Sequence, residues 1–208
     1  MILIGQYDSP FVRRVGIALT LYELPFRHET WSAFGDAAKL GEVNPLMRVP
    51  TLVLDDGTVL SDSHCMLDYL DSLVPEEKAM FPRREPARHQ ALRIATLATG
   101  LGDKAVSLFY EKRLHKEVSQ FWAERCRSQI FAALGALEAE RGRQQTNYWF
   151  GARIGHADIA IAAVLRFIGE AHPGLAPIDG YPRLKAHAEL LEDLPAFRKI
   201  NQAFIPPA

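Results

Sequence analysis

The sequence predicts a small α/β domain followed by an all-α domain, and three features of the chain support this fold class. Residues 1–75 alternate short apolar runs with helical patterns, in the order βαβ and then ββα. Residues 76–86 contain Pro82, Pro86 and several charged side chains, a composition typical of an interdomain linker. Residues 87–208 show only helical patterns, so the two domains are expected over 1–75 and 87–208.

The first domain is expected to open with a strand, a helix and a second strand. The apolar run from Ile2 to Gly5 has the length of a short buried strand, and Pro10 suits the first position of a helix. This helix should run to about Leu24, because Pro25 follows it. Phe26 to Thr30 is the expected second strand, parallel to the first because a helix connects them.

The rest of the first domain is expected to be a hairpin and a helix, preceded by a loop with a short helix through Trp31 to Val43. Thr51 to Leu54 is apolar and β-branched, and the turn sequence Asp55-Asp56-Gly57 leads to a second strand over Val59 to Ser61. A helical pattern then runs from Ser63 to Leu73.

The second domain should contain a buried central helix. The stretch from Gly155 to Leu165 is too apolar for a surface helix, and Asp158 can accept a hydrogen bond from the amide of the expected N-cap, Gly155. The helices are expected over about Ala87 to Leu108, Lys116 to Arg141, His156 to Glu170 and Tyr181 to Leu191, with a short one after Pro195.

The composition favours a small-molecule partner. With 48% hydrophobic residues, 24% charged residues and a formal net charge of −1, the chain has no basic excess that would indicate nucleic acid or an anionic membrane. Its first residues lack the basic region of a signal peptide and no apolar stretch is long enough to cross a membrane, so we expect a cytoplasmic protein. Cys65 and Cys126 form no metal-binding or redox motif and are expected to be buried thiols.

Residues 44–63 contain the pattern that points most directly to a function. Val49-Pro50 comes directly before a predicted strand, and proline has no amide hydrogen to give to a sheet. We expect a bend at Pro50 with a cis Val49–Pro50 peptide bond. Such a bend would expose the backbone of Val49, so that an extended peptide could pair with it as an added strand. Asp62 and Ser63 stand where the following helix leaves amides unpaired, and such an end favours anions.

These motifs resemble the N-terminal domain of cytosolic glutathione S-transferases of the serine type. The matching features are Asn44-Pro45 with Val49-Pro50, the pair Asp62-Ser63, and Ser9-Pro10 at the first helix, and the resemblance extends over nearly the whole chain. It implies a thioredoxin-like domain that holds glutathione and a helical domain that covers it. It also implies a transferase that uses glutathione as cosubstrate, forms a homodimer and serves in detoxification.

Ser9 is the residue on which the expected chemistry depends. Glutathione reacts as its thiolate, and a free thiol with a pKa of about 8.5 is mostly protonated at neutral pH. A hydroxyl donor would stabilise the anion by about 1.5–3 kcal/mol and a helix N-terminus by about 0.3–1 kcal/mol, which together lower the thiol pKa by about one to three units.

The resemblance implies that Ser9 donates this hydroxyl. The alternative role for Ser9 is helix capping, and Tyr7 is the competing donor. Since serine and not cysteine stands here, conjugation is expected rather than disulfide exchange.

By the same resemblance, Asp62 would bind the γ-glutamyl ammonium group, and the Ser63 hydroxyl and amide would bind its carboxylate. The alternative is that Asp62 and Ser63 only cap the helix and bind no ligand. Many relatives carry Glu where Asp62 stands. Arg48 could reach the glycine carboxylate and Phe11 could form a wall of the thiol site, although a solvated Arg and a core Phe fit equally well. The expected glutathione site comprises Ser9, Phe11, Arg48, Val49, Pro50, Asp62 and Ser63, with no metal.

The second domain offers residues that could border an electrophile. They are Phe109, Tyr110, Lys112, Arg113, His115, Phe121 and Trp122, near the turn between its first two helices. Packing between helices is an equal alternative for Phe121 and Trp122. His64 and Cys65 show no partner in the sequence and are expected to be structural or peripheral.

The function expected from the sequence is the addition of glutathione thiolate to a small hydrophobic electrophile. A non-catalytic binding or assembly module on the same scaffold is one alternative. A glutathione-dependent isomerase of the zeta type is another, but the zeta motif has a second Ser and a Cys where this chain has Pro10 and Phe11.

Overall fold

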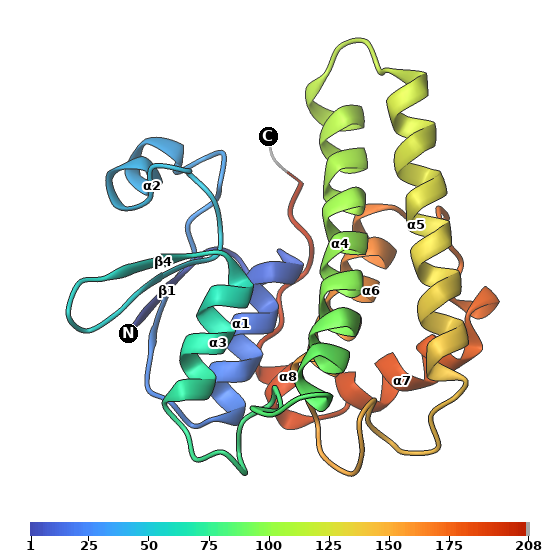
Figure 1. Ribbon diagram of the computed structural model, residues 1–208. Coiled ribbons are helices and arrows are strands. Elements are labelled where there is room, and N and C mark those ends of the chain that lie inside the picture. The colour runs from blue at the N-terminus through green and yellow to red at the C-terminus, as the bar shows by residue number, and fades with distance from the viewer. Residues whose placement is uncertain (207–208) are drawn as a thin grey trace.

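The computed structural model describes residues 1–206, in which an N-terminal α/β domain packs against a helical domain (Figure 1). This confirms the predicted fold class. In the first domain the elements are β1 (Ile2–Ile4), α1 (Pro10–Leu21), β2 (Arg27–Glu29), α2 (Ala37–Val43), β3 (Thr51–Val53), β4 (Val59–Ser61) and α3 (Ser63–Ser72).

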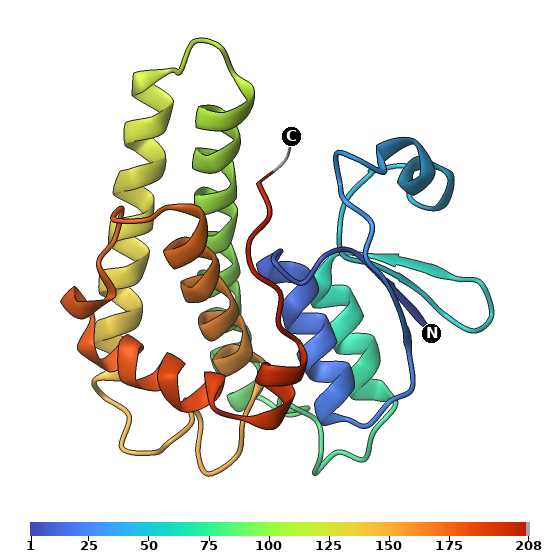
Figure 2. The same ribbon diagram turned by 180° about the vertical axis from the view of Figure 1, so that it is seen from behind.

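The sheet of the described residues has the strand order β2-β1-β3-β4. β1 pairs with β2 in parallel and β3 pairs with β4 as an antiparallel hairpin, as predicted. The antiparallel pairing of β1 with β3, which sets Ile4 opposite Thr51, was not predicted. α1 and α3 pack side by side, and the buried Leu3 and Leu52 of the two central strands belong to the core (Figures 1 and 2).

In the helical domain, α4 and α5 form a long pair and α6 lies between α4 and α1. The chain that follows α8 then runs between the two domains (Figure 2). The helices are α4 (Ala87–Leu114), α5 (Gln120–Arg141), α6 (His156–Ala171), α7 (Pro182–Glu192) and α8 (Pro195–Lys199), with a 3₁₀ turn at Ile178–Gly180. None of the helices within residues 1–206 is long and apolar enough to cross a membrane.

α6 is buried along most of its length, which confirms the prediction for this segment. Asp158 holds its first turn, because one carboxylate oxygen accepts from the Gly155 amide at 2.8 Å and the other accepts from the Trp149 amide at 2.8 Å. A glycine cap therefore suffices here, since the acidic half of the capping box is in place and is shared with the preceding loop.

A buried polar cluster around Asp71 joins the two domains. The Asp71 carboxylate accepts hydrogen bonds from the Tyr22 hydroxyl and, at 3.0 Å, from the Phe81 amide, and it lies 2.9 Å from His156 Nε2. These groups come from α3, the end of α1, the interdomain segment and the start of α6. The expected linker 76–86 is thus not solvated throughout, because Phe81 is buried.

Several helix boundaries differ from the prediction for local reasons. α1 ends at Leu21, because Glu23 adopts a φ of 57° and cannot continue the helix. α4 continues to Leu114, beyond the expected Leu108, with basic residues in its last turn that complement the helix dipole. α5 begins only at Gln120, because the Ser119 hydroxyl caps it by accepting from the Trp122 amide.

The expectation of two buried cysteines was half wrong. Cys126 is buried, as predicted, but Cys65 is exposed on α3.

Candidate functional site

Ser9 forms the N-cap of α1, and Pro10 occupies the first helical position. The Ser9 hydroxyl oxygen accepts from the Val12 amide at 3.4 Å. Because this contact uses an oxygen lone pair, the hydroxyl hydrogen remains available to a group in front of the helix. Capping and donation to an anion are therefore compatible roles for this side chain.

The turn that carries Arg48 and Val49 is fixed from behind by Asn44 and Thr51. The buried Asn44 side-chain amide donates to the Thr51 hydroxyl at 2.8 Å, and that hydroxyl donates to the Arg48 carbonyl at 2.8 Å. The Val49–Pro50 bond is cis, as expected. No hydrogen bond joins the Val49 backbone to another group within residues 1–206, so this backbone is open to a ligand.

Asp62 and Ser63 stand at the start of α3. Asp62 is the N-cap, its carboxylate accepts from the His64 amide at 2.8 Å, and its φ of 82° lies in a region that non-glycine residues rarely adopt. Such a conformation costs about 1–3 kcal/mol and is found most often at binding sites. Ser63 is almost fully buried beneath it.

A buried cation lies behind Ser63. Arg14 is 1% exposed, and its Nη1 donates to the Ser63 hydroxyl oxygen at 3.2 Å. Its Nε and Nη2 have no partner among the described residues. Burial lowers the pKa of Arg14 to about 10, an effect that the negative charge of Asp62 opposes, so this side chain is still cationic at neutral pH. The start of α3 is thereby more attractive to an anion than a helix terminus alone.

His64, for which the sequence shows no partner, has contacts that agree with the expected structural role. Its Nε2 lies 3.0 Å from the Thr99 hydroxyl and 3.4 Å from Arg14 Nη1. Burial and the nearby positive charge of Arg14 lower the pKa of His64 to about 4. The imidazole is therefore neutral at pH 7 and links α3 to α4 beside the site.

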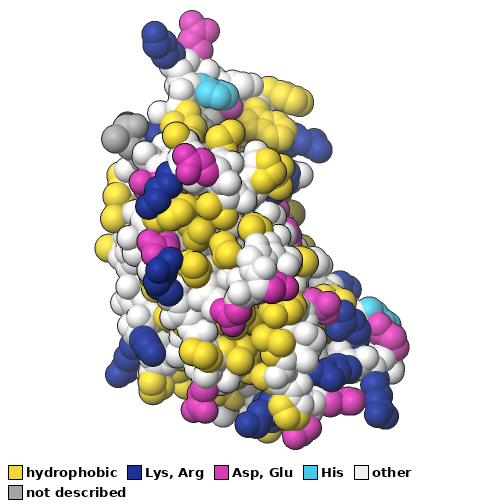
Figure 3. All heavy atoms as spheres, turned by 90° about the vertical axis from the view of Figure 1, so that its left-hand side faces the viewer, with side chains coloured by type: hydrophobic (Ala, Val, Ile, Leu, Met, Phe, Trp, Pro, Cys, Tyr) yellow, Lys and Arg dark blue, Asp and Glu magenta, His cyan; other side chains and the backbone are white. Residues whose placement is uncertain are grey.

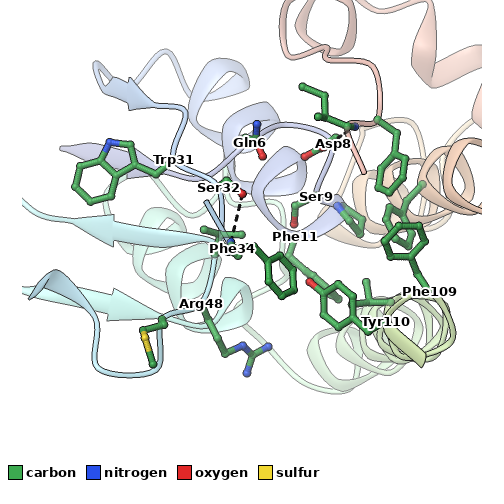
Figure 4. A pocket seen from close by; sticks show the side chains of 18 of the residues that line it. Gln6, Asp8, Ser9, Phe11, Trp31, Ser32, Phe34, Arg48, Phe109 and Tyr110 are labelled. Carbon is green, nitrogen blue, oxygen red and sulfur yellow. Dashed lines mark hydrogen bonds between the residues drawn. The ribbon is translucent and has the colours of Figure 1, made fainter. Parts of the chain in front are cut away.

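Two adjoining cavities bring the predicted site residues together. The inner cavity, of about 230 Å³, is bordered by Pro50, Asp62 and Ser63. The outer cavity, of about 320 Å³, is bordered by Ser9 (Figure 4). Both cavities are bordered by Phe11, Arg48, Val49 and Asp103. A ligand that occupies the inner cavity can thus extend past Val49 toward Ser9.

Tyr7, the competing hydroxyl donor, does not border either cavity in the described structure. Its ring stacks on His28 at 3.8 Å between centroids. Burial raises the pKa of Tyr7 to about 12. This geometry favours Ser9 over Tyr7 as the group that contacts a ligand.

The walls of the outer cavity are largely aromatic. Phe109 and Tyr110 of α4 contribute, as expected, and Tyr110 meets Phe34 of the first domain edge to face at 5.2 Å. Phe121 and Trp122 border neither cavity in the described structure, so the expected role beside an electrophile is wrong for both. Phe121 is 81% exposed, which also contradicts packing between helices, whereas Lys104 Nζ of α4 lies 5.8 Å from the centroid of the Trp122 ring, in agreement with that alternative. The basic residues Lys112, Arg113 and His115 are likewise not among the residues that border these cavities.

Some site residues were missed by the sequence analysis although a signal was present. Thr99, Asp103 and Val106 share the helical spacing of Tyr110, which was expected, and this face of α4 borders the cavities. Asp8, Phe204 and Ile205 had no such signal, since the two C-terminal residues reach the outer cavity from the far end of the chain.

Comparison with known proteins gives two matching family models. The model for the N-terminal domain of glutathione S-transferases matches residues 3–78, and the model for the C-terminal domain matches residues 120–190.

Individual relatives agree with these models. A probable maleylacetoacetate isomerase of Caenorhabditis elegans is 27% identical over 94% of this chain and 90% of its own length. The uncharacterized GST-like protein YibF of Escherichia coli K12 is 31% identical over 66% of this chain and 68% of its own. The crystal structure of a glutathione S-transferase from Methylobacterium radiotolerans, in complex with glutathione sulfonate, has a TM-score of 0.89 at 26% identity and covers 100% of this chain and 98% of that one.

Proposed function

Because this chain belongs to the glutathione S-transferase family, we propose that it is a glutathione transferase with a role in detoxification. Glutathione occupies the inner cavity, and its thiol reaches Ser9 in the outer one. The observation that carries this proposal is the continuity of the two cavities past Val49, which gives an extended tripeptide one path from Asp62 and Ser63 to Ser9.

The start of α3 binds the γ-glutamyl end of glutathione. The Asp62 carboxylate attracts the ammonium group, while the Ser63 hydroxyl, backed by Arg14, donates to the carboxylate. The Val49 backbone pairs with the cysteinyl residue as an added strand would. Arg48, which borders both cavities, attracts the glycine carboxylate.

Ser9 stabilises the thiolate by donating its hydroxyl hydrogen to the sulfur. A hydrogen bond to a charged group contributes about 1.5–3 kcal/mol, which lowers the thiol pKa by about one to two units. The thiol proton leaves to solvent, and the sulfur lone pair forms a C–S bond with the electrophilic carbon. The electron pair displaced from that carbon departs with a leaving group or, in an addition, takes up a proton.

Calorimetric titration with glutathione and with S-hexylglutathione tests the binding site, and the pH dependence of thiolate absorbance in the complex tests the activation. We expect both ligands to bind and the thiol pKa to lie below the free value of about 8.5. If neither ligand bound, the non-catalytic module would become the better description of the chain.

Three substitutions separate the roles of the site residues. Ser9→Ala should lower turnover by about tenfold or more while the Kd for glutathione changes little, because the hydroxyl acts on the thiolate. Ser63→Ala should raise the Kd instead. Tyr7→Phe should leave both values near those of the wild type, and loss of turnover in this variant with full activity in Ser9→Ala would transfer the sulfur role to Tyr7.

A zeta-type isomerase is a second candidate, because relatives over almost the whole chain are named maleylacetoacetate isomerases. In such a reaction glutathione adds to a double bond, the bond rotates, and glutathione is eliminated unchanged. Pro10 and Phe11 depart from the zeta motif, and Phe11 borders both cavities. Glutathione-dependent isomerisation of maleylacetoacetate by the purified protein, at a rate above its conjugating activity, would favour this candidate.

We also propose that the chain forms a homodimer. Large hydrophobic side chains are exposed in both domains, with Leu46 60% exposed, Met47 50% and Phe121 81%. Figure 3 shows hydrophobic side chains along one face of the molecule, with charged side chains of both signs among them and at its margins. Light scattering after size-exclusion chromatography should give twice the mass of one chain, and the mass of a single chain would contradict the proposal.

A further inference from the structure

The outer cavity contains one carboxylate without a compensating cation. Its volume of about 320 Å³ is at the small end for ligand sites, and its walls are mainly aromatic and aliphatic. Asp8, Arg48 and Asp103 are the charged residues that border it in the described structure. Their placement decides which charge an electrophile can carry.

Arg48 and Asp103 offset one another where the two cavities meet. Both side chains border both cavities. Burial raises the pKa of Asp103, and the positive charge of Arg48 lowers it, so the two charges act on each other across this boundary. The proposed binding mode also gives Arg48 the glycine carboxylate of glutathione as a partner.

Asp8 lies at the opposite end of the outer cavity from Arg48, with Ser9 and Phe11 between them (Figure 4). It is half-buried, and no Lys or Arg forms an ion pair with it within residues 1–206. Burial raises the pKa of Asp8, the backbone amides of Ile205, Ser9 and Asp8 itself partly oppose this shift, and the nearby negative charge of Glu170 adds to it.

The Asp8 carboxylate also retains hydrogen-bonding capacity. Its Oδ2 accepts from the Ile205 amide at 3.0 Å, which holds the C-terminal segment at the cavity wall. A carboxylate offers about four acceptor positions, so this contact leaves room for a donor from a ligand. An anionic ligand group at the same place would meet a half-buried negative charge that no Lys or Arg of the described residues pairs with.

Building on the proposed transferase function, we propose that Asp8 is a specificity residue that selects compact aromatic electrophiles with a hydrogen-bond-donating group and rejects those with a carboxylate. The donor group of the electrophile pairs with Asp8, the ring packs among the aromatic walls, and the reacting carbon faces the thiolate beside Ser9. This selection also disfavours a dicarboxylate such as maleylacetoacetate.

Two reagents of similar size test this assignment, 4-chloro-3-nitrobenzamide and 4-chloro-3-nitrobenzoate. In both, the thiolate forms a C–S bond, the C–Cl bond breaks, and chloride leaves with the bonding electrons. Each kcat/KM is divided by the rate constant of the same reagent with free glutathione thiolate, which removes their different intrinsic reactivity. We expect the normalised value for the benzamide to exceed that for the benzoate by about tenfold or more in the wild type.

Asp8→Asn should reduce this preference by about tenfold, mainly through faster reaction of the benzoate, because asparagine still accepts from the Ile205 amide but carries no charge. Asp103→Asn is the matched comparison and should change the preference much less, because Arg48 already offsets Asp103.

The outcomes that overturn the inference differ from those that overturn the proposed function. Equal normalised rates for the two reagents in the wild type, or an unchanged preference in a folded Asp8→Asn variant, would remove the role of Asp8 and leave the transferase intact. A larger effect of Asp103→Asn would give the role to Asp103. Absence of turnover with the benzamide and with 1-chloro-2,4-dinitrobenzene would instead overturn the transferase function, and the role of Asp8 with it.

Discussion

Arg13 and Arg14 are adjacent, and both are buried, but their contacts give them different tasks. Arg13 forms a bidentate pair with Glu192, at 2.6 Å for each nitrogen–oxygen contact, and its Nε donates to the Ile200 carbonyl at 3.0 Å. It therefore ties α1 to the C-terminal helices. Arg14 points the other way, to the Ser63 hydroxyl at the proposed glutathione site.

The two variants Arg13→Met and Arg14→Met should therefore give opposite results. Arg14→Met should raise the Kd for glutathione by about tenfold, equivalent to about 1.4 kcal/mol, because it removes the cation behind Ser63. Arg13→Met should lower the free energy of unfolding by about 3 kcal/mol and change the Kd little, because it removes the bidentate pair and leaves Glu192 only the 3.8 Å contact with Arg166. Titration calorimetry and urea unfolding measure the two effects, and equal loss of affinity in both variants would contradict the assignment.

The sequence predicted the residues that belong to local motifs. Ser9, Val49, Asp62 and Ser63 could be found because each stands at a helix start or beside a proline, where backbone groups are necessarily unpaired. The role of Arg14 could not be predicted in this way. Arg13 and Arg14 are adjacent on the same helix, so the local sequence does not indicate which of them lies behind Ser63. Only the packing of α1 against α3 on the side of Arg14 and against the C-terminal helices on the side of Arg13 distinguishes the two side chains.

Among the secondary-structure elements, α1, α3 and α6 meet at the buried pair of His156 and Asp71. His156 is fully buried and its Nε2 lies 2.9 Å from the Asp71 carboxylate. Burial lowers the pKa of His156, although Asp71 acts against this shift. Burial raises the pKa of Asp71, but the hydrogen bonds from His156, Tyr22 and the Phe81 amide outweigh this effect and hold the pKa below the usual value.

These shifts predict that the folded protein loses stability as the pH falls. Below about pH 6.5 the unfolded chain protonates His156 while the folded chain does not, so the free energy of unfolding decreases by up to about 1.4 kcal/mol per pH unit for this residue. The contribution of Asp71 is present above the ordinary carboxyl pKa of about 3.9 and is lost only at lower pH. His64 and His172, whose pKa values are also lowered by burial, act in the same direction as His156.

Urea unfolding between about pH 7 and about pH 5 tests this prediction in the wild type and in His156→Gln. The variant should show a smaller slope of free energy against pH, by about 1.4 kcal/mol per pH unit at most. His89→Gln is a suitable control, because His89 is exposed on α4. Parallel curves for the wild type and His156→Gln would show that His156 keeps its proton in the folded state.

Most elements could be predicted from the sequence, whereas their ends and the order of strands depended on contacts outside them. α6 was recognisable because its apolar run is too long for a surface helix. The end of α1 depends on the left-handed conformation of Glu23, and glutamate gives no sequence signal for it. The position of β1 between β2 and β3 follows from pairing over a long sequence separation, which no local pattern specifies.

At the scale of the whole molecule, the C-terminal segment runs between the two domains (Figure 2), and its residues Phe204 and Ile205 border the outer cavity. The Gln202 side chain accepts from the Tyr7 amide at 3.0 Å, and the Gln202 carbonyl accepts from Arg166 at 3.3 Å. Two residues later, the Phe204 amide donates to Glu170 at 2.9 Å. The segment thus contacts the α/β domain and α6 in turn, and the outer cavity is complete only when the chain end is in place.

Phe204 is the residue of this segment whose removal should change the electrophile site most directly. Its ring lies edge to face with Phe109 at 5.1 Å and with Phe167 at 5.6 Å between ring centroids, and all three rings border the outer cavity.

Phe204→Ala should raise the KM for an aromatic electrophile by about three- to tenfold, because it removes one wall of this cavity. The Kd for glutathione should stay within about twofold of the wild type, because the inner cavity does not include Phe204. Phe131→Ala, at an exposed phenylalanine of α5 that borders neither cavity in the described structure, is the matched control and should change neither constant. If Phe204→Ala raised the Kd for glutathione as strongly as the KM, the segment would act by holding the two domains together, and the electrophile site would depend on their relative position rather than on this one ring.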